Sequence, residues 1–125
     1  MNYQGVIIEE SLQDAGIMKE LKTVSTKIEP ITPRHKTPWL KQWTLRTVEI
    51  PENKAEYFAN KLSQLFDINH PDWYIDYKNT LYHFIIYPNK VFKVDLQNPA
   101  QYHDAKLYGL SIGIPDYQLS FPPQD

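Results

Sequence analysis

A run of short apolar segments separated by turn residues spans residues 73 to 96, WYIDYKNTLYHFIIYPNKVFKVDL. The segments are short and rich in aromatic and β-branched residues, which is typical of strands rather than helices. The sequences KNT and YPNK separate them and favour turns, so we predict strands at about Trp73 to Lys78, Leu81 to Tyr87 and Val91 to Leu96. Strands joined by turns this short pair antiparallel.

Two amphipathic segments flank these strands and predict the main helices. PENKAEYFANKLSQLF, residues 51 to 66, has a proline suited to the first turn and one apolar stripe made of Ala55, Phe58, Ala59, Leu62, Leu65 and Phe66. NPAQYHDAKLYGLSIG, residues 98 to 113, has Asn98 as a capping residue, Pro99 at the first helical position and Gly109 or Gly113 as an end signal.

The first 50 residues add three predicted strands, at GVII from residue 5, TVSTKIE from residue 23 and WTLRTVEI from residue 43. A short helical segment around Ile17 and a proline-punctuated loop from Pro30 lie between them. The whole order predicts one α+β domain over residues 1–125. We expect an antiparallel sheet of five or six strands with the two main helices packed on one face.

Composition restricts the function classes. The 125 residues are 42% apolar and 22% charged, with a formal charge of −2, which describes an ordinary globular domain. This charge argues against nucleic-acid binding, which requires a basic surface. The absence of cysteine excludes disulfides and thiolate chemistry. No targeting segment or membrane-length apolar run is recognised, so we expect a cytoplasmic protein without a membrane partner.

His83 is the first candidate catalytic residue, and its role depends on the hairpin register. A two-residue turn at Pro88-Asn89 would place His83 opposite Val94. Absorbing Lys90 into a bulged turn would place His83 opposite Asp95 instead. The second register separates apolar from polar residues better, and we favour it. An Asp95 carboxylate beside the imidazole could then orient a general base, although a cross-strand polar pair on a solvated face is the commoner outcome.

Asp76 is the third candidate catalytic residue, and it raises the question of a metal site. Asp72 and Asp76 could supply carboxylates, with His70 as a further ligand. His70 precedes a proline in a loop, and no second histidine lies at the short spacing of metal-binding motifs. The sequence therefore predicts neither a metal nor another cofactor.

Aromatic residues supply the candidate binding surface. HKTPWLKQW, residues 35 to 43, places His35, Trp39 and Trp43 in and after a loop that could form a pocket rim. Trp73 and Lys93 are further candidates on the predicted sheet. The alternative for these rings is packing in the core, and the nearby aspartates argue against a base-stacking platform.

The C-terminal sequence GLSIGIPDYQLSF is too apolar for a free tail. Ile114, Leu119 and Phe121 are expected to dock either on the chain's own sheet or on a second copy. The second case would make the protein a homodimer.

The segments IIEESL, TPWLKQWTLRTVEIP, WYIDYKN, VFKVD and YGLSIGIPDYQLSF together resemble a family of small bacterial and archaeal proteins without an assigned activity. The resemblance covers about Gly5 to Phe121. It implies a self-contained α+β unit in a microbial cytoplasm and transfers no functional residue.

Three functions remain open from the sequence. The first is a non-catalytic module that binds a small molecule or a protein through the Trp39/Trp43 loop and the sheet face around His83. The second is a small enzyme with His83 as base, Asp95 as its orienting partner and Asp76 or Lys93 nearby. Single-stranded nucleic-acid binding comes third because of the charge.

Overall fold

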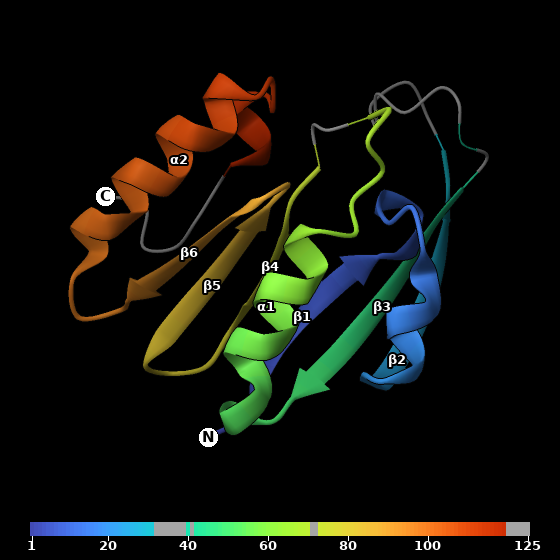
Figure 1. Cartoon of the computed structure of the whole chain (residues 1–125), viewed down its shortest axis with the longest axis horizontal. Helices are drawn as coiled ribbons and strands as arrows, with labels where there is room; N and C mark the ends of the chain where they lie inside the picture. The colour runs from blue at the N-terminus through green and yellow to red at the C-terminus, as the bar shows by residue number, and fades with distance from the viewer. Residues whose placement is uncertain (32–39, 41, 71–72, 120–125) are drawn as a thin grey trace.

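The computed structural model describes residues 1–31, 40, 42–70 and 73–119 (Figure 1). The elements in chain order are β1 (Tyr3–Ile8), η1 (Glu9–Ser11), η2 (Ala15–Lys19), β2 (Lys22–Pro30), β3 (Gln42–Ile50), η4 (Glu52–Lys54), α1 (Ala55–Ser63), β4 (Ile75–Lys78), β5 (Tyr82–Tyr87), β6 (Lys90–Asp95), η5 (Pro99–Gln101), α2 (Tyr102–Ser111) and η6 (Asp116–Gln118). In the described ranges no helix is long and apolar enough to cross a membrane.

The six strands form one antiparallel sheet in the order β2-β3-β1-β4-β5-β6. The predicted α+β class, the antiparallel sheet and the two main helices are thereby confirmed. β1 lies in the middle of the sheet, between β3 and β4, although it comes first in the sequence. The β4-β5-β6 half is the predicted meander, whose tight turns keep neighbouring strands adjacent.

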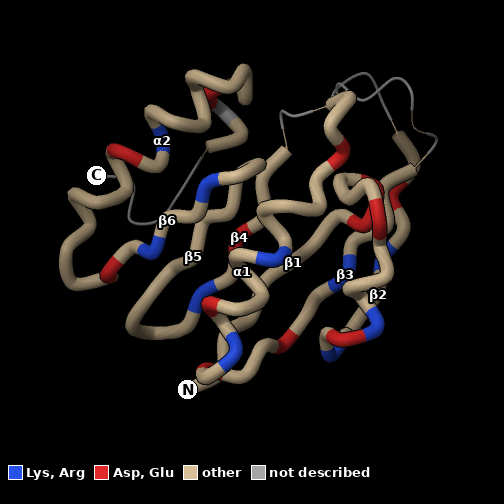
Figure 2. The backbone as a smooth tube through the Cα atoms, viewed as in Figure 1, with Lys and Arg blue, Asp and Glu red and all other residues tan. Residues whose placement is uncertain are grey.

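The edge strand β2 is exposed along most of its length. It carries charged residues, and Lys22 and Lys27 pair with Glu49 and Glu29. Figure 2 shows Lys and Arg interspersed with Asp and Glu here and over the rest of the described chain. Charges on an edge strand discourage pairing with another chain, so this edge gives no support to the homodimer, which stays a prediction.

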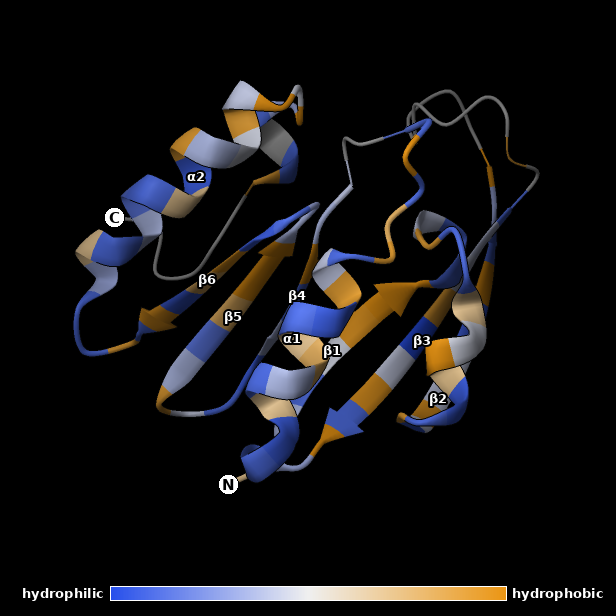
Figure 3. Ribbon diagram, in the orientation of Figure 1, coloured by the Kyte–Doolittle hydropathy of each residue, from blue (hydrophilic) through white to orange (hydrophobic). Residues whose placement is uncertain are grey.

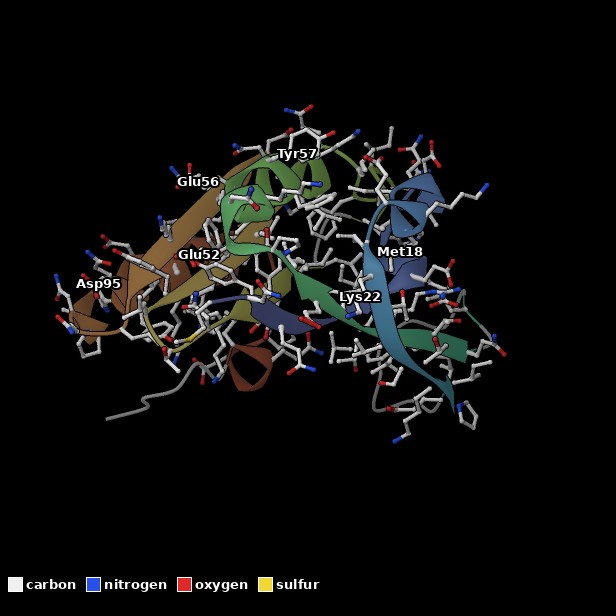
Figure 4. The ribbon with its side chains drawn as sticks, turned by 90° about the horizontal axis from the view of Figure 1, so that it is seen from below. Met18, Lys22, Glu52, Glu56, Tyr57 and Asp95 are labelled. Carbon is white, nitrogen blue, oxygen red and sulfur yellow. The ribbon has the colours of Figure 1, made fainter. Side chains whose placement is uncertain are left out.

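The two helices lie on opposite faces of the sheet, and our expectation of a single face is wrong (Figure 4). β5 is buried from His83 to Tyr87, so both of its faces need cover. Phe84 and Ile86 pack in the core with α1, while Ile85 and Tyr87 pack in the core with α2. A continuous apolar strand is the sign of burial on both faces.

The hairpin register we favoured from the sequence is also wrong. β5 and β6 are joined by the two-residue turn Pro88-Asn89, which pairs His83 with Val94 and Tyr82 with Asp95. Asn89 has a φ of 59°, and a proline followed by a residue of positive φ is the pattern of a type II turn. Our preference assumed that one face of the hairpin is polar. Both faces are covered, so that reason did not apply.

The core under α1 confirms the predicted stripe of that helix. Ala55, Phe58, Ala59 and Leu62 are buried against the sheet together with residues of β1, β3 and β4. Figure 3 shows the hydrophobic residues along β1 and β5 and alternating colours along β3, the pattern of strands that contribute side chains to a core.

The core under α2 includes the residues that follow this helix. Ile114 and Leu119 are buried with Ile85 and Tyr87, so this part of the predicted apolar tail docks on the chain's own sheet. The Tyr87 hydroxyl donates to the Ala105 carbonyl at 2.7 Å. A Cβ at Gly109 would come within 2.8 Å of both Leu119 and the Tyr87 hydroxyl, so helix and strand approach too closely there for a side chain.

Gly5 has the same role between β1 and β4. A Cβ at this position would lie 2.2 Å from the Asp76 carbonyl oxygen and 2.7 Å from the Tyr77 Cβ. We expect Gly5→Ala to lower the free energy of unfolding by about 1–3 kcal/mol, because the overpacked strands must move apart. Urea unfolding measures this change. Ser25→Ala on the exposed edge strand is the control and should change it by less than about 0.5 kcal/mol. Equal small effects at both positions would show that β1 and β4 are not in close contact.

Candidate functional site

A hollow of about 340 Å³ lies on the α2 side of the sheet, over β1, β3 and the start of β4. The register of the strands shows which face the hollow is on, because paired residues on neighbouring strands point to the same face. Val6 pairs with Asp76, and Asp76 pairs with Ile85, which belongs to the core under α2. The volume is within the range of small-molecule sites. The lining residues come from β1, β3, the start of β4 and η6, namely Val6, Ile8, Trp43, Leu45, Trp73, Tyr74, Asp76 and Gln118.

Two tryptophans form the aromatic wall of the hollow. The Trp43 and Trp73 rings meet edge to face, with centroids 5.5 Å apart and an angle of 62°. Trp73 is buried, and among the described residues its Nε1–H finds no acceptor. An unpaired buried donor costs about 1–3 kcal/mol. The packing of Trp73 against Trp43 and the α1 core must offset this cost.

Tyr74 ties the C-terminal segment to the hollow. Its hydroxyl donates to the Gln118 carbonyl oxygen at 2.5 Å, and Gln118 precedes the buried Leu119. Burial raises the pKa of Tyr74, and the Asp76 carboxylate raises it further. The hydroxyl therefore stays protonated and keeps donating.

Asp76 is the one carboxylate among the described lining residues of the hollow. Its side chain is 41% exposed, and its Oδ2 lies 2.7 Å from His83 Nε2. Asp76 pairs with Ile85 in the sheet, so His83 is its diagonal neighbour on the same face. Diagonal neighbours are within reach of long side chains, and this register brings two of the three predicted catalytic residues together.

His83 lies behind Asp76 and is closed off from solvent. Its side chain is 1% exposed, and Nδ1 lies 2.8 Å from the Tyr102 hydroxyl at the start of α2. An ionised carboxylate only accepts hydrogen bonds, so Nε2 carries the proton shared with Asp76. In a neutral imidazole the other nitrogen accepts, so the Tyr102 hydroxyl then donates to Nδ1. Burial raises the pKa of Tyr102, with a further contribution from Asp76, which keeps that donor protonated. Asp76, His83 and Tyr102 thus form one hydrogen-bonded chain, which we call the Asp76–His83–Tyr102 chain.

Asp95 does not contact His83, which corrects the predicted pair. It stands opposite Tyr82, so its side chain lies on the other face of the hairpin. Its Oδ1 accepts from the Gln97 backbone N–H, and its own N–H donates to the Gln101 side chain. Figure 4 shows Asp95 at the end of β6, at the outer edge of the molecule. Its role here is to shape the turn that leads into η5.

Lys93 lies on the α1 side of the sheet, away from the hollow. Its ammonium is 3.1 Å from Glu56 on α1 and 4.4 Å from the centroid of the Tyr82 ring. The hydrogen bond to Glu56 raises its pKa. Lys93 therefore connects β6 to α1, on the face opposite Asp76.

Of the predicted binding residues, Trp43 and Trp73 line the hollow, while His35 and Trp39 lie outside the described residues. Sequence reasoning missed Tyr102, Tyr74 and Gln118. Tyr102 carried one usable signal, since it begins the apolar stripe of the second helix. No group of three His, Asp or Glu side chains in the described part of the chain could hold a metal ion.

Comparison with known protein families, curated proteins and solved structures finds no match to this chain. The resemblance to small microbial proteins therefore stays a prediction.

The Asp76–His83–Tyr102 chain can be tested through stability. Tyr102→Phe should lower the free energy of unfolding by about 1–3 kcal/mol, because the buried His83 Nδ1 loses its donor. Tyr82→Phe is the matched control, since Tyr82 is half-buried and its hydroxyl bonds to none of the described residues. It should change the free energy by less than about 0.5 kcal/mol. Equal effects of the two variants in urea unfolding would contradict the proposed hydrogen bond.

Proposed function

We propose that this protein is a non-catalytic binding module that holds a small molecule in the hollow between Trp43, Trp73 and Asp76. The proposal rests on the convergence of two indoles, three aliphatic strand residues and one carboxylate around a space of about 340 Å³. Small-molecule sites are typically concave and mostly apolar, with few polar groups that fix the ligand's orientation.

The position of His83 argues against acid–base catalysis by this residue. A general base must reach the proton that it removes, directly or through one water molecule. The imidazole is 1% exposed, and both of its ring nitrogens are engaged, with Asp76 and Tyr102. Only Asp76 of the Asp76–His83–Tyr102 chain lines the hollow. This arrangement supports a positioning role for His83 and favours binding over the enzyme hypothesis.

The charge pattern argues against nucleic-acid binding, the third hypothesis. Nucleic-acid sites need cationic side chains that are free to contact phosphates. Many of the described basic side chains are instead paired with carboxylates: Lys22, Lys27, Arg46, Lys61, Lys93 and Lys106. None of them lines the hollow.

The exposed apolar residues support a small ligand over a protein partner. A stable protein interface buries about 800 Å² on each partner. The large exposed apolar side chains of the described residues are spread over the molecule, with at most two on any one helix or strand: Val6 on β1, Val24 and Ile28 on β2, Tyr57 on α1, Leu107 and Leu110 on α2, and Met1, Ile68 and Leu81 outside these elements. Of these residues, Val6 lines the hollow.

Titration with indole tests the proposal, followed by ¹H–¹⁵N NMR of the backbone and tryptophan side chains. We expect saturable shifts of the Trp43 and Trp73 signals, with a Kd of about 1 mM for a probe of this size. Val6→Trp should abolish these shifts, because the new ring fills the hollow from β1.

Val24→Trp is the matched control, since Val24 is 45% exposed and Val6 is 43% exposed, but Val24 lies on the edge strand outside the hollow. It should leave the shifts unchanged. Shifts that do not saturate, or that persist in Val6→Trp, would contradict the proposal.

A further inference from the structure

We infer that the molecule bound in the hollow is an organic cation, an apolar or aromatic group joined to a protonated amine. This inference rests on the proposed function and specifies its ligand class. It follows from three features of the hollow: a carboxylate that forms no ion pair with any described Lys or Arg, aromatic walls and a buried support that fixes the carboxylate's orientation.

No Lys or Arg side chain in the described part of the chain neutralises the Asp76 charge. None of the described Lys or Arg side chains forms an ion pair with Asp76, and none lines the hollow. Its described partner is His83, and a neutral imidazole that donates its Nε2–H leaves the carboxylate charge in place. A negative charge set among apolar side chains attracts a cation and repels an anion, since water screens it less there than at an open surface.

The walls of the hollow favour the same ligand. Tryptophan faces attract cations more strongly than other aromatic rings, and a cation within about 6 Å of a ring centroid is stabilised. Trp43, Trp73 and Tyr74 stand around Asp76 in the hollow. A ligand amine at the carboxylate therefore has aromatic rings beside it, and the apolar part of the ligand can pack against Ile8 and Leu45.

The buried support leaves one carboxylate oxygen for the ligand. His83 holds Asp76 Oδ2 at 2.7 Å, while Tyr102 holds His83 from the opposite side at 2.8 Å. Among the described residues none donates to Asp76 Oδ1. Because the 1% exposed imidazole is itself fixed, the carboxylate is oriented before any ligand arrives, and preorganisation of this kind lowers the cost of binding.

Three probes with a common phenylethyl body test the inference: 2-phenylethylammonium, neutral 2-phenylethanol and anionic 3-phenylpropanoate. Binding is followed through the Trp43 and Trp73 NMR signals at low salt. We expect the ammonium to bind about tenfold more tightly than the alcohol, from the carboxylate and the aromatic rings together. The propanoate should not bind measurably. Added sodium chloride should weaken binding of the ammonium and leave the alcohol unchanged.

Asp76→Asn should abolish the preference, so that ammonium and alcohol bind equally, while its amide oxygen can still accept from His83. Asp104→Asn, which removes an exposed carboxylate of α2, should keep the tenfold preference. Equal binding of ammonium and alcohol to the unaltered protein would overturn the inference and leave the proposed function standing. No saturable binding of any probe would overturn both. A lysine-containing peptide that shifts these signals more strongly than the free amine would also overturn it, because the occupant would then be a protein side chain.

Discussion

The burial of β5 on both faces is the constraint on which the rest of this structure depends. β5 lies between β4 and β6 and is apolar on both faces, so each face must be shielded from water. α1 packs on the face that carries Phe84 and Ile86, and α2 packs on the face that carries Ile85 and Tyr87. His83 lies within the same buried run. A buried imidazole needs partners for both ring nitrogens, and it finds them in Asp76 of β4 and Tyr102 of α2. The Asp76–His83–Tyr102 chain therefore ties two neighbouring strands to the helix that covers them.

The hollow exists because α2 covers only part of its face of the sheet. The core under α2 takes its sheet residues from β5 and β6, whereas β1 and β3 contribute their inward side chains to the α1 core. The opposite side chains of β1 and β3, Val6, Ile8, Trp43 and Leu45, remain at the edge of the covered region. Asp76 stands at this boundary with one oxygen held from the buried side. The site is thus a consequence of packing a short helix on a broad sheet.

The features that could be predicted from the sequence are those that depend on residues close together in the chain. Strand and helix segments were found because apolar spacing and turn residues act over a few neighbours, as in the stripe from Ala55 to Leu62. Trp43, Trp73, Asp76 and His83 were singled out from the sequence for different roles; the first three line the hollow, and His83 contacts Asp76. The partner of His83 was predicted wrongly, because the choice between Val94 and Asp95 depends on whether the second face of β5 is covered. That cover comes from α2, and no local pattern relates Tyr102 to a strand 19 residues earlier.

The position of the proton on the His83 ring decides whether the Asp76–His83–Tyr102 chain forms as described. Long-range ¹H–¹⁵N NMR of the imidazole at neutral pH distinguishes a protonated nitrogen from one that accepts a hydrogen bond. We expect a proton on Nε2, donated to Asp76, and an unprotonated Nδ1 that accepts from Tyr102. A proton on Nδ1 alone, or a ring that averages rapidly between its two neutral forms, would contradict this expectation. Asp76 would then lack its buried support, and the hollow would lack the oriented carboxylate on which the proposed binding depends.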